Sequence, residues 1–176
     1  MALPHGFEIR PVRDQDSAGL IALVGAVYAE YEGCVLDLDG VDADLTAPRT
    51  VFDRKRGDLW VVTDRSGTIA ACCGWAPVDE DTVELKRLYV RPDIRRRGVG
   101  AWLVGQVEQV ARERGASRVV LWSDSRFEEA HGLYERLGYR DTGQRRDLND
   151  PSATTEKRFE RTLDSEGVEP DQLDEP

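Results

Sequence analysis

Residues 83–116 constrain the possible fold more than any other part of this chain, because a strand pattern there passes through a basic turn into a long helical pattern. Branched apolar residues alternate over residues 83–90, with one slip in the alternation between Leu85 and Leu88. A slip of this kind predicts a β-bulge. Apolar residues then recur at helical spacing over residues 99–111. The segment is therefore predicted to be a buried strand, a tight turn and a helix.

The turn at residues 95–100 has the composition of an anion site. Three arginines precede Gly98 and Gly100, and a residue without a β-carbon lets backbone N–H groups approach a ligand closely. The start of a helix adds unpaired N–H donors and the positive end of its dipole. Two nucleotide-binding motifs are excluded. The sequence has no Gly-Lys-Ser/Thr of a P-loop, and Leu103 stands where a dinucleotide fingerprint needs its third glycine.

Two motifs resemble those of the GCN5-related N-acetyltransferases. The turn resembles the Arg/Gln-x-x-Gly-x-Gly/Ala pyrophosphate loop of that family, with Arg95, Gly98 and Gly100 at the motif positions. The sequence AHGLYERLGY at residues 130–139 resembles the family's helix motif, in which a tyrosine precedes Leu-Gly-Tyr/Phe. The order and separation of both motifs match, and the resemblance extends over about residues 7–163. It implies an α/β fold with a mixed, mostly antiparallel central sheet flanked by helices.

The remaining patterns are consistent with that order of elements. Strands are predicted at residues 7–12, 59–63, 68–76, 83–90, 118–122, 139–142 and 155–163. A helix over residues 20–28 is predicted after caps at residues 14–17, and a second over 41–56 with an interruption at Pro48. The other predicted helices run from residue 99 to a stop at Gly115, and over 126–137 with a capping box formed by Ser125 and Glu128. A helical crossover joins the strands at 83–90 and 118–122, so these two are predicted to be parallel.

Length, charge and cysteine content bound the class of protein. The 176 residues are predicted to form one domain at residues 1–163, followed by an acidic, disordered tail at residues 164–176. The formal net charge of -10 argues against nucleic acid as a partner. Cys34, Cys72 and Cys73 have neither a disulfide pattern nor a metal-binding spacing, and no apolar run could span a membrane. We therefore expect a reduced cytoplasmic protein without a metal, a nucleic-acid partner or a membrane segment.

The family resemblance implies acetyl-coenzyme A as the co-substrate and indicates where it binds. Backbone N–H groups of Leu88 and Val90, next to the bulge, would hold the carbonyl and the pantetheine arm. The pyrophosphate would rest on the turn, although its arginines could equally be a solvated run. The expected cofactor-binding residues are Leu88, Tyr89, Val90, Arg95, Arg96, Arg97, Gly98, Val99, Gly100 and Ala101.

Tyr134 is the candidate general acid, because the helix motif implies a phenol close to the thioester sulfur. Its spacing alone favours a different role, since Phe127, Ala130, Tyr134 and Leu137 form an apolar stripe typical of a core helix. The family motif favours the catalytic role. Phe127 stands where many members of the family carry Asn.

Glu84 is the candidate base, acting directly or through water, because many members of the family carry an acid at this strand position. The alternative is an exposed strand glutamate of no catalytic importance. His131, three residues before Tyr134, is a second candidate base, although a lone helical histidine is more often structural. Cys72 and Cys73 are expected to pack within a strand.

These features predict an acetyl-coenzyme A dependent N-acetyltransferase that transfers the acetyl group directly to a primary amine. A small cationic acceptor is expected, such as a polyamine, an amino sugar, an aminoglycoside-like compound or an amino acid derivative. This expectation rests on an acidic segment with no base, which contains Glu30, Glu32, Asp37, Asp39, Asp42 and Asp44. A protein N-terminal or lysine acetyltransferase and a non-catalytic coenzyme-binding module remain alternatives. A homodimer is one assembly that the prediction leaves open.

Overall fold

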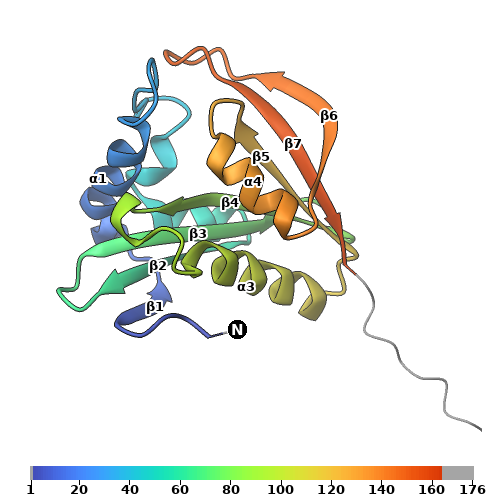
Figure 1. Cartoon of the computed structure of the whole chain (residues 1–176), viewed down its shortest axis with the longest axis horizontal. Helices are drawn as coiled ribbons and strands as arrows, with labels where there is room; N and C mark the ends of the chain where they lie inside the picture. The colour runs from blue at the N-terminus through green and yellow to red at the C-terminus, as the bar shows by residue number, and fades with distance from the viewer. Residues whose placement is uncertain (1, 164–176) are drawn as a thin grey trace, which may run out of the picture.

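The computed structural model describes residues 2–163, so the predicted tail at residues 164–176 lies outside the described residues. A single seven-stranded sheet, in the order β1-β2-β3-β4-β5-β7-β6, forms the centre of the molecule (Figure 1). The strands are β1 (Phe7–Pro11), β2 (Asp58–Asp64), β3 (Ile69–Pro77), β4 (Thr82–Val90), β5 (Arg118–Asp124), β6 (Arg140–Asp147) and β7 (Thr155–Thr162). The helices are α1 (Ser17–Tyr28), α2 (Pro48–Arg54), α3 (Val99–Glu113) and α4 (Glu128–Arg136), with short 3-10 turns at Asp14–Asp16, Ala43–Leu45 and Pro92–Ile94.

β4 and β5 form the one parallel pair in this sheet, and the other neighbouring strands are antiparallel. The mixed, mostly antiparallel sheet and the parallel pairing are both confirmed. The pairing is short, because it extends only from Thr82 opposite Arg118 to Leu85 opposite Leu121. Figure 1 shows β4 and β5 side by side where both strands begin and diverging towards their ends.

The predicted bulge in β4 is present at Arg87. The register with β3 shifts between Cys72 and Gly74, which pair with Tyr89 and Lys86, and Arg87 adopts a φ of 54°. This extra residue reverses the alternation of side chains beyond it. Val83 and Leu85 before the bulge, and Leu88 and Val90 after it, therefore contact the same hydrophobic core.

Two cores cover the two faces of the sheet. On one face α3 contributes Leu103, Val104, Val107 and Ala111 to a core that also contains Tyr134 of α4. On the other face α1 contributes Leu20, Leu23 and Val24 to a core that also contains Phe52 of α2. The two pairs of helices thus define an α3/α4 face and an α1/α2 face. Within residues 2–163, no helix combines the length and apolarity needed to cross a membrane.

Three local predictions differ from the structure. α4 begins at Glu128 with Phe127 as its N-cap and no side-chain cap, so the capping box of Ser125 and Glu128 is wrong. β6 extends to Asp147, beyond the predicted end at residue 142, because every residue of this edge strand is exposed and no apolar alternation marks it. Pro48 begins α2 as its first residue, where its missing N–H costs nothing, so the helical piece starts there.

Two glycines give opposite expectations for stability. A β-carbon on Gly74 would lie 2.6 Å from the Phe52 ring and 3.0 Å from the carbonyl oxygen of Asp58, whereas one on Gly105 in α3 would have nothing within 4 Å. We expect Gly74→Ala to lower the free energy of unfolding by about 1–3 kcal/mol through overpacking. Gly105→Ala should raise it by up to about 1 kcal/mol, because alanine is the better helix former. Urea unfolding measures both, and equal effects of the two substitutions would contradict the packing around Gly74.

Candidate active site

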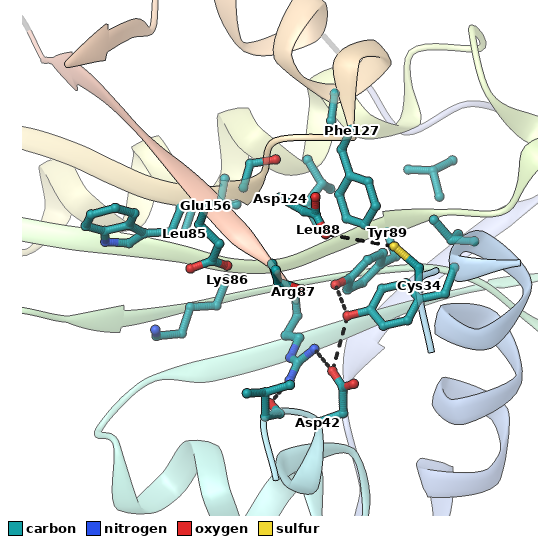
Figure 2. Close-up of a pocket in the computed structure, with 18 of the residues that line it drawn as sticks. Cys34, Asp42, Leu85, Lys86, Arg87, Leu88, Tyr89, Asp124, Phe127 and Glu156 are labelled. Carbon is teal, nitrogen blue, oxygen red and sulfur yellow. Dashed lines mark hydrogen bonds and ion pairs between the residues drawn. The ribbon is translucent and has the colours of Figure 1, made fainter. Parts of the chain in front are cut away.

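A cavity of about 930 Å³ opens where β4 and β5 separate. Its wall includes Leu88 and Val90 of β4, and Trp122 and Ser123 of β5, all beyond the last paired residues of the two strands. The start of α3, the helix α4 and the segment between α1 and α2 complete the wall. Because the cavity lies at a break in the sheet, side chains from both faces reach it. Figure 2 shows 18 of the residues that line it.

The edge of β4 that faces the cavity carries backbone groups without a partner strand. The N–H of Arg91 donates to the carbonyl oxygen of Ala70 at 2.8 Å, so it points towards β3. Backbone groups alternate in direction along a strand, and those of Leu88 and Val90 therefore point towards the open edge. The carbonyl oxygen of Val90 confirms this direction, since it accepts a hydrogen bond from Nε of Arg95 at 3.1 Å. The N–H groups of this edge can donate to a ligand carbonyl.

The side chain of Arg87 ties the bulge to the segment between α1 and α2. Its Nη1 donates to Asp42 Oδ1 at 2.8 Å, its Nε donates to Asp44 Oδ2 at 3.0 Å, and its Nη2 also reaches the carbonyl oxygen of Val41 at 2.8 Å (Figure 2). Asp42 is only 1% exposed, so its charge is compensated inside the protein. These contacts fix one wall of the cavity relative to β4.

Two tyrosines extend this network across the cavity wall. The hydroxyl of Tyr28 donates to Asp42 at 3.2 Å and lies 3.2 Å from the hydroxyl of Tyr89 (Figure 2). Burial, together with the neighbouring Tyr89, raises the pKa of Tyr28, which stays protonated. The side chain of Tyr89, predicted to contact the cofactor, is therefore directed to the α1/α2 face, where it packs against the second core.

Half of the carboxylates of the acidic segment form ion pairs with arginines of the protein, which the sequence does not indicate. Asp42 and Asp44 bind Arg87, and Glu30 forms a two-pronged pair with Arg95 at 2.6 and 2.8 Å. Asp37 accepts a hydrogen bond from the N–H of Val41 at 3.3 Å. Glu32 and Asp39 are exposed, and neither forms an ion pair with another described residue.

The turn before α3 presents backbone donors to the cavity. Gly98 is the N-cap of α3 with a φ of 84°, and Arg96 also has a positive φ of 60°. In the part of the chain that the structure describes, no N–H group of residues 96–101 donates to a protein acceptor. A β-carbon on Gly98 would have nothing within 4 Å, so the space next to this backbone is open. The arrangement suits an anion with several oxygens.

The arginine side chains of the turn contribute less to the anion site than the backbone N–H groups do. Arg95 lines the cavity, but its guanidinium is held by Glu30. The side chain of Arg96 is 89% exposed, and Arg97 is exposed and lies outside the cavity wall. Val99 is buried in the core, so it can offer a ligand only its N–H. Gly98, Gly100 and Ala101 line the cavity as expected.

Tyr134 belongs both to the core stripe and to the cavity wall. Its ring packs against Phe159 at 5.8 Å and Tyr139 at 6.0 Å between ring centres, and the residue is 4% exposed. Tyr134 nevertheless lines the cavity, and its hydroxyl has no hydrogen-bond partner among the described residues. Burial raises the pKa of this phenol, which therefore keeps its proton. The two interpretations of Tyr134 are thus compatible.

Glu84 reaches the cavity from the opposite face of the sheet. Its neighbours Val83 and Leu85 face the α3/α4 core, so the side chain of Glu84 points to the α1/α2 face. It pairs with Nζ of Lys86 at 2.7 Å, and both residues line the cavity. A carboxylate on one side and the phenol of Tyr134 on the other can accept and donate a proton on opposite sides of a bound ligand.

The other candidate side chains lie away from the cavity. Nε2 of His131 is 3.0 Å from the carbonyl oxygen of Asp124 and 3.2 Å from Oγ of Ser123, and the ring is buried outside the cavity wall. Cys72 and Cys73 are buried in β3, and burial raises the pKa of Cys72 to about 12. Both cysteines thus pack within the strand. Within residues 2–163, no group of three or more acidic, histidine or cysteine side chains is placed to hold a metal ion.

Several residues of the cavity wall were not foreseen. Phe127 packs its ring against Tyr31 with 4.7 Å between ring centres, and both residues line the cavity. Lys55 comes from the end of α2, and Arg146 lies over the Trp122 ring at 4.3 Å. None of these positions follows from a local pattern, because each depends on which distant segments the sheet brings together.

Comparisons with known proteins agree with this geometry. Residues 26–139 match the model of the acetyltransferase (GNAT) family. The chain is similar to an uncharacterized N-acetyltransferase of Schizosaccharomyces pombe, with 28% identity over 81% of this chain and 88% of the relative. It is also similar to an uncharacterized N-acetyltransferase of Escherichia coli, with 30% identity over 77% and 83% of the two chains. The PaiA N-acetyltransferase of Thermoplasma acidophilum, solved in complex with coenzyme A, has the same fold, with a TM-score of 0.68, 15% identity, and coverage of 89% and 99%.

The buried ring of His131 predicts a pH dependence of stability. Burial is the largest cause that lowers the pKa of His131 below 6.5, Lys157 adds to it, and Asp141 and Glu135 act in the opposite direction. As the pH falls, His131 therefore binds a proton in the unfolded chain at a higher pH than in the folded protein. The stabilisation is complete above about pH 6.5 and is lost as the pH falls towards the lowered pKa of the folded state. We expect the melting temperature of the wild type to fall more steeply than that of His131→Gln between about pH 7.5 and 5.5. Parallel curves would contradict a neutral buried His131.

Proposed function

Because this chain belongs to the acetyltransferase (GNAT) family and is an N-acetyltransferase, we propose that it takes acetyl-coenzyme A as donor and acetylates a small primary amine in the cavity between β4 and β5. The observation that carries this proposal is the composition of one cavity wall. It combines the unpaired N–H groups of residues 96–101, the open edge of β4, and the phenol of Tyr134. In order, these three features would bind a phosphate, bind a carbonyl oxygen and donate a proton, and all three border the same cavity.

The residues of the wall fit coenzyme A by their chemistry. The N–H groups before α3 would hold the pyrophosphate, and the open backbone at Gly98 leaves room for it. N–H groups of Leu88 and Val90 would hold the thioester carbonyl and the amides of the pantetheine arm. A relative of the same fold was solved with coenzyme A, which supports the same ligand here.

Glu84 and Tyr134 each carry out one of the two proton transfers of the reaction. Glu84 takes a proton from the acceptor nitrogen, directly or through water, as that nitrogen attacks the thioester carbon, and later releases the proton to solvent. The new C–N bond forms as the C–S bond breaks, and the sulfur leaves as a thiolate. Tyr134 gives its proton to that sulfur and regains one from solvent. Glu84 and Tyr134 lie on opposite faces of the sheet, so each has separate access to the amine or the sulfur.

The acceptor is proposed to be a small primary amine. The sequence-based expectation of a cationic acceptor depended on six carboxylates in residues 30–44. Since Arg87 and Arg95 hold three of them, only Glu32, Asp37 and Asp39 could still attract a cation from solution without giving up an ion pair. The acidic segment therefore supports a polyamine less than its composition indicates.

Tyr134→Phe should separate turnover from binding. The substitution removes the proton donor and little volume, so we expect kcat to fall by about a hundredfold while affinity for acetyl-coenzyme A stays within about twofold. Tyr139→Phe is the matched control, because its hydroxyl donates to Glu108 at 3.1 Å in the core and lies outside the cavity wall. Thiol release with an amine panel measures turnover. If Tyr134→Phe has the same kcat as the wild type, Tyr134 is only a core residue.

Gly100→Leu should weaken coenzyme A binding. A side chain there would enter the cavity next to Leu133 and Val90, whose nearest atoms lie 3.2 and 3.7 Å from the added β-carbon. We expect the Kd for coenzyme A, measured by calorimetry, to rise at least about tenfold, or about 1.4 kcal/mol. Gly105→Leu places the same side chain in open space further along α3 and should leave the Kd unchanged. Equal affinities of the two variants would remove the proposed pyrophosphate site from this turn.

A further inference from the structure

The charged side chains that line the cavity differ in whether they already have a partner. Every lining carboxylate accepts an ion pair or hydrogen bond from the protein: Asp42 and Asp44 from Arg87, Glu84 from Lys86, Asp124 from Arg126, Glu129 from Arg95, Asp150 from Thr154, and Glu156 from Arg146. Among the lining cations, Lys55 and Arg136 have no carboxylate within ion-pair distance in residues 2–163. Among the described residues the cavity wall thus has two cations without an ion pair, whereas Asp150, bound only by hydrogen bonds from Thr154, is the one lining carboxylate without one.

The two available cations lie on opposite faces of the sheet. Arg136 belongs to α4, the helix that carries Tyr134, and so lies on the side proposed for coenzyme A. Lys55 is the C-cap of α2, and its Nζ lies 5.3 Å from the centre of the Phe52 ring in the core of the α1/α2 face. Glu84, the proposed base, points to that same face. Lys55 is therefore the available cation on the acceptor side.

The neighbours of Lys55 leave its charge uncompensated. The charged groups that act on it are the carboxylates Asp44 and Glu84 and the cations Lys86 and Arg87. Asp44 is bound to Arg87 at 2.5 Å, and Glu84 is bound to Lys86 at 2.7 Å. Burial and the two neighbouring cations lower the pKa of Lys55, so an added anion would stabilise its charged form.

We propose that the acceptor amine also carries a carboxylate, as an amino acid does, and that Lys55 and Lys86 bind that carboxylate. This inference rests on the proposed function. The amine of such an acceptor can replace Lys86 at Glu84, which frees Lys86 to join Lys55 on the carboxylate. The exchange replaces the one pair of Glu84 with Lys86 by a pair at Glu84 and a carboxylate held by two lysines. A molecule with one amine and one carboxylate also adds no net charge to the cavity. A polyamine would have to break an existing ion pair for each ammonium group beyond the one that Asp150 could bind.

The test compares L-amino acids with their carboxamides, which keep the shape and the amine but lose the negative charge. Thiol release from acetyl-coenzyme A gives kcat and KM for each pair. For the wild type we expect kcat/KM to be at least about tenfold higher for the acids that serve as substrates than for their amides. A preference for the amides or for a polyamine would overturn the inference.

Lys55→Met should raise KM for the acids about tenfold and leave kcat/KM for the amides unchanged, because only the acids carry the group that Lys55 binds. Lys55→Glu should lower kcat/KM for the acids further. Arg54→Met is the matched control, since it removes the same charge one residue earlier in α2 from a side chain outside the cavity wall. Equal losses for acids and amides in Lys55→Met would show a structural role and contradict the inference.

A binding measurement distinguishes failure of the inference from failure of the proposed function. The stabilisation of the coenzyme-loaded protein by each acid and amide is measured as a shift in melting temperature. Binding of an acid that Lys55→Met abolishes, with no thiol release, would support the carboxylate site and overturn the acetyltransfer. Thiol release without a difference between acids and amides would overturn the carboxylate site alone. If the acids neither bind nor cause thiol release, both the carboxylate site and the acetyltransfer are overturned.

Discussion

The ion pairs of Arg87 with Asp42 and Asp44 are the contacts on which the site depends. A non-glycine residue with a φ of 54° is disfavoured by about 1 kcal/mol or more, and Arg87 is held in this conformation by four hydrogen bonds to residues 41–44. The resulting bulge keeps Leu88 and Val90 on the α3/α4 face and turns their N–H groups to the open edge of β4. Burial of Asp42 makes the pairing strongly preferred once the segment has docked, because an unpaired charge there would be costly.

The separation of β4 from β5 follows from what each strand pairs with. β5 stays in register with β7 along its full length, from Arg118 opposite Thr162 to Asp124 opposite Glu156. β4 instead stays with β3 through the bulge, so the two parallel strands share only their first four pairs. In the proposed reaction, a cavity at this break in the sheet would let a proton acceptor and a proton donor act from opposite faces. Glu84 and Tyr134 both line this cavity.

Sequence patterns predicted the parts of this structure that depend on neighbouring residues. The bulge between Leu85 and Leu88, the helix after Gly98 and the parallel crossover all follow from local periodicity and connection rules, and all are present. The partner of each charge could not be predicted in this way. Arg87 lies 43 and 45 residues from the carboxylates that it binds. Half of the carboxylates in an acidic stretch that suggested a surface for cations are therefore counter-charges to arginines of the protein.

The same contacts connect the two halves of the proposed reaction. The segment at residues 41–44 leads into α2, which carries Lys55, and the guanidinium of Arg87 joins this segment to the bulge that aligns the β4 edge. The wall that would select the acceptor and the edge that would hold the thioester carbonyl are therefore fixed to each other by one side chain. A small misplacement of reacting groups lowers the reaction rate strongly. The buried ion pair at this junction can therefore matter more for positioning the reacting groups than for the stability of the fold.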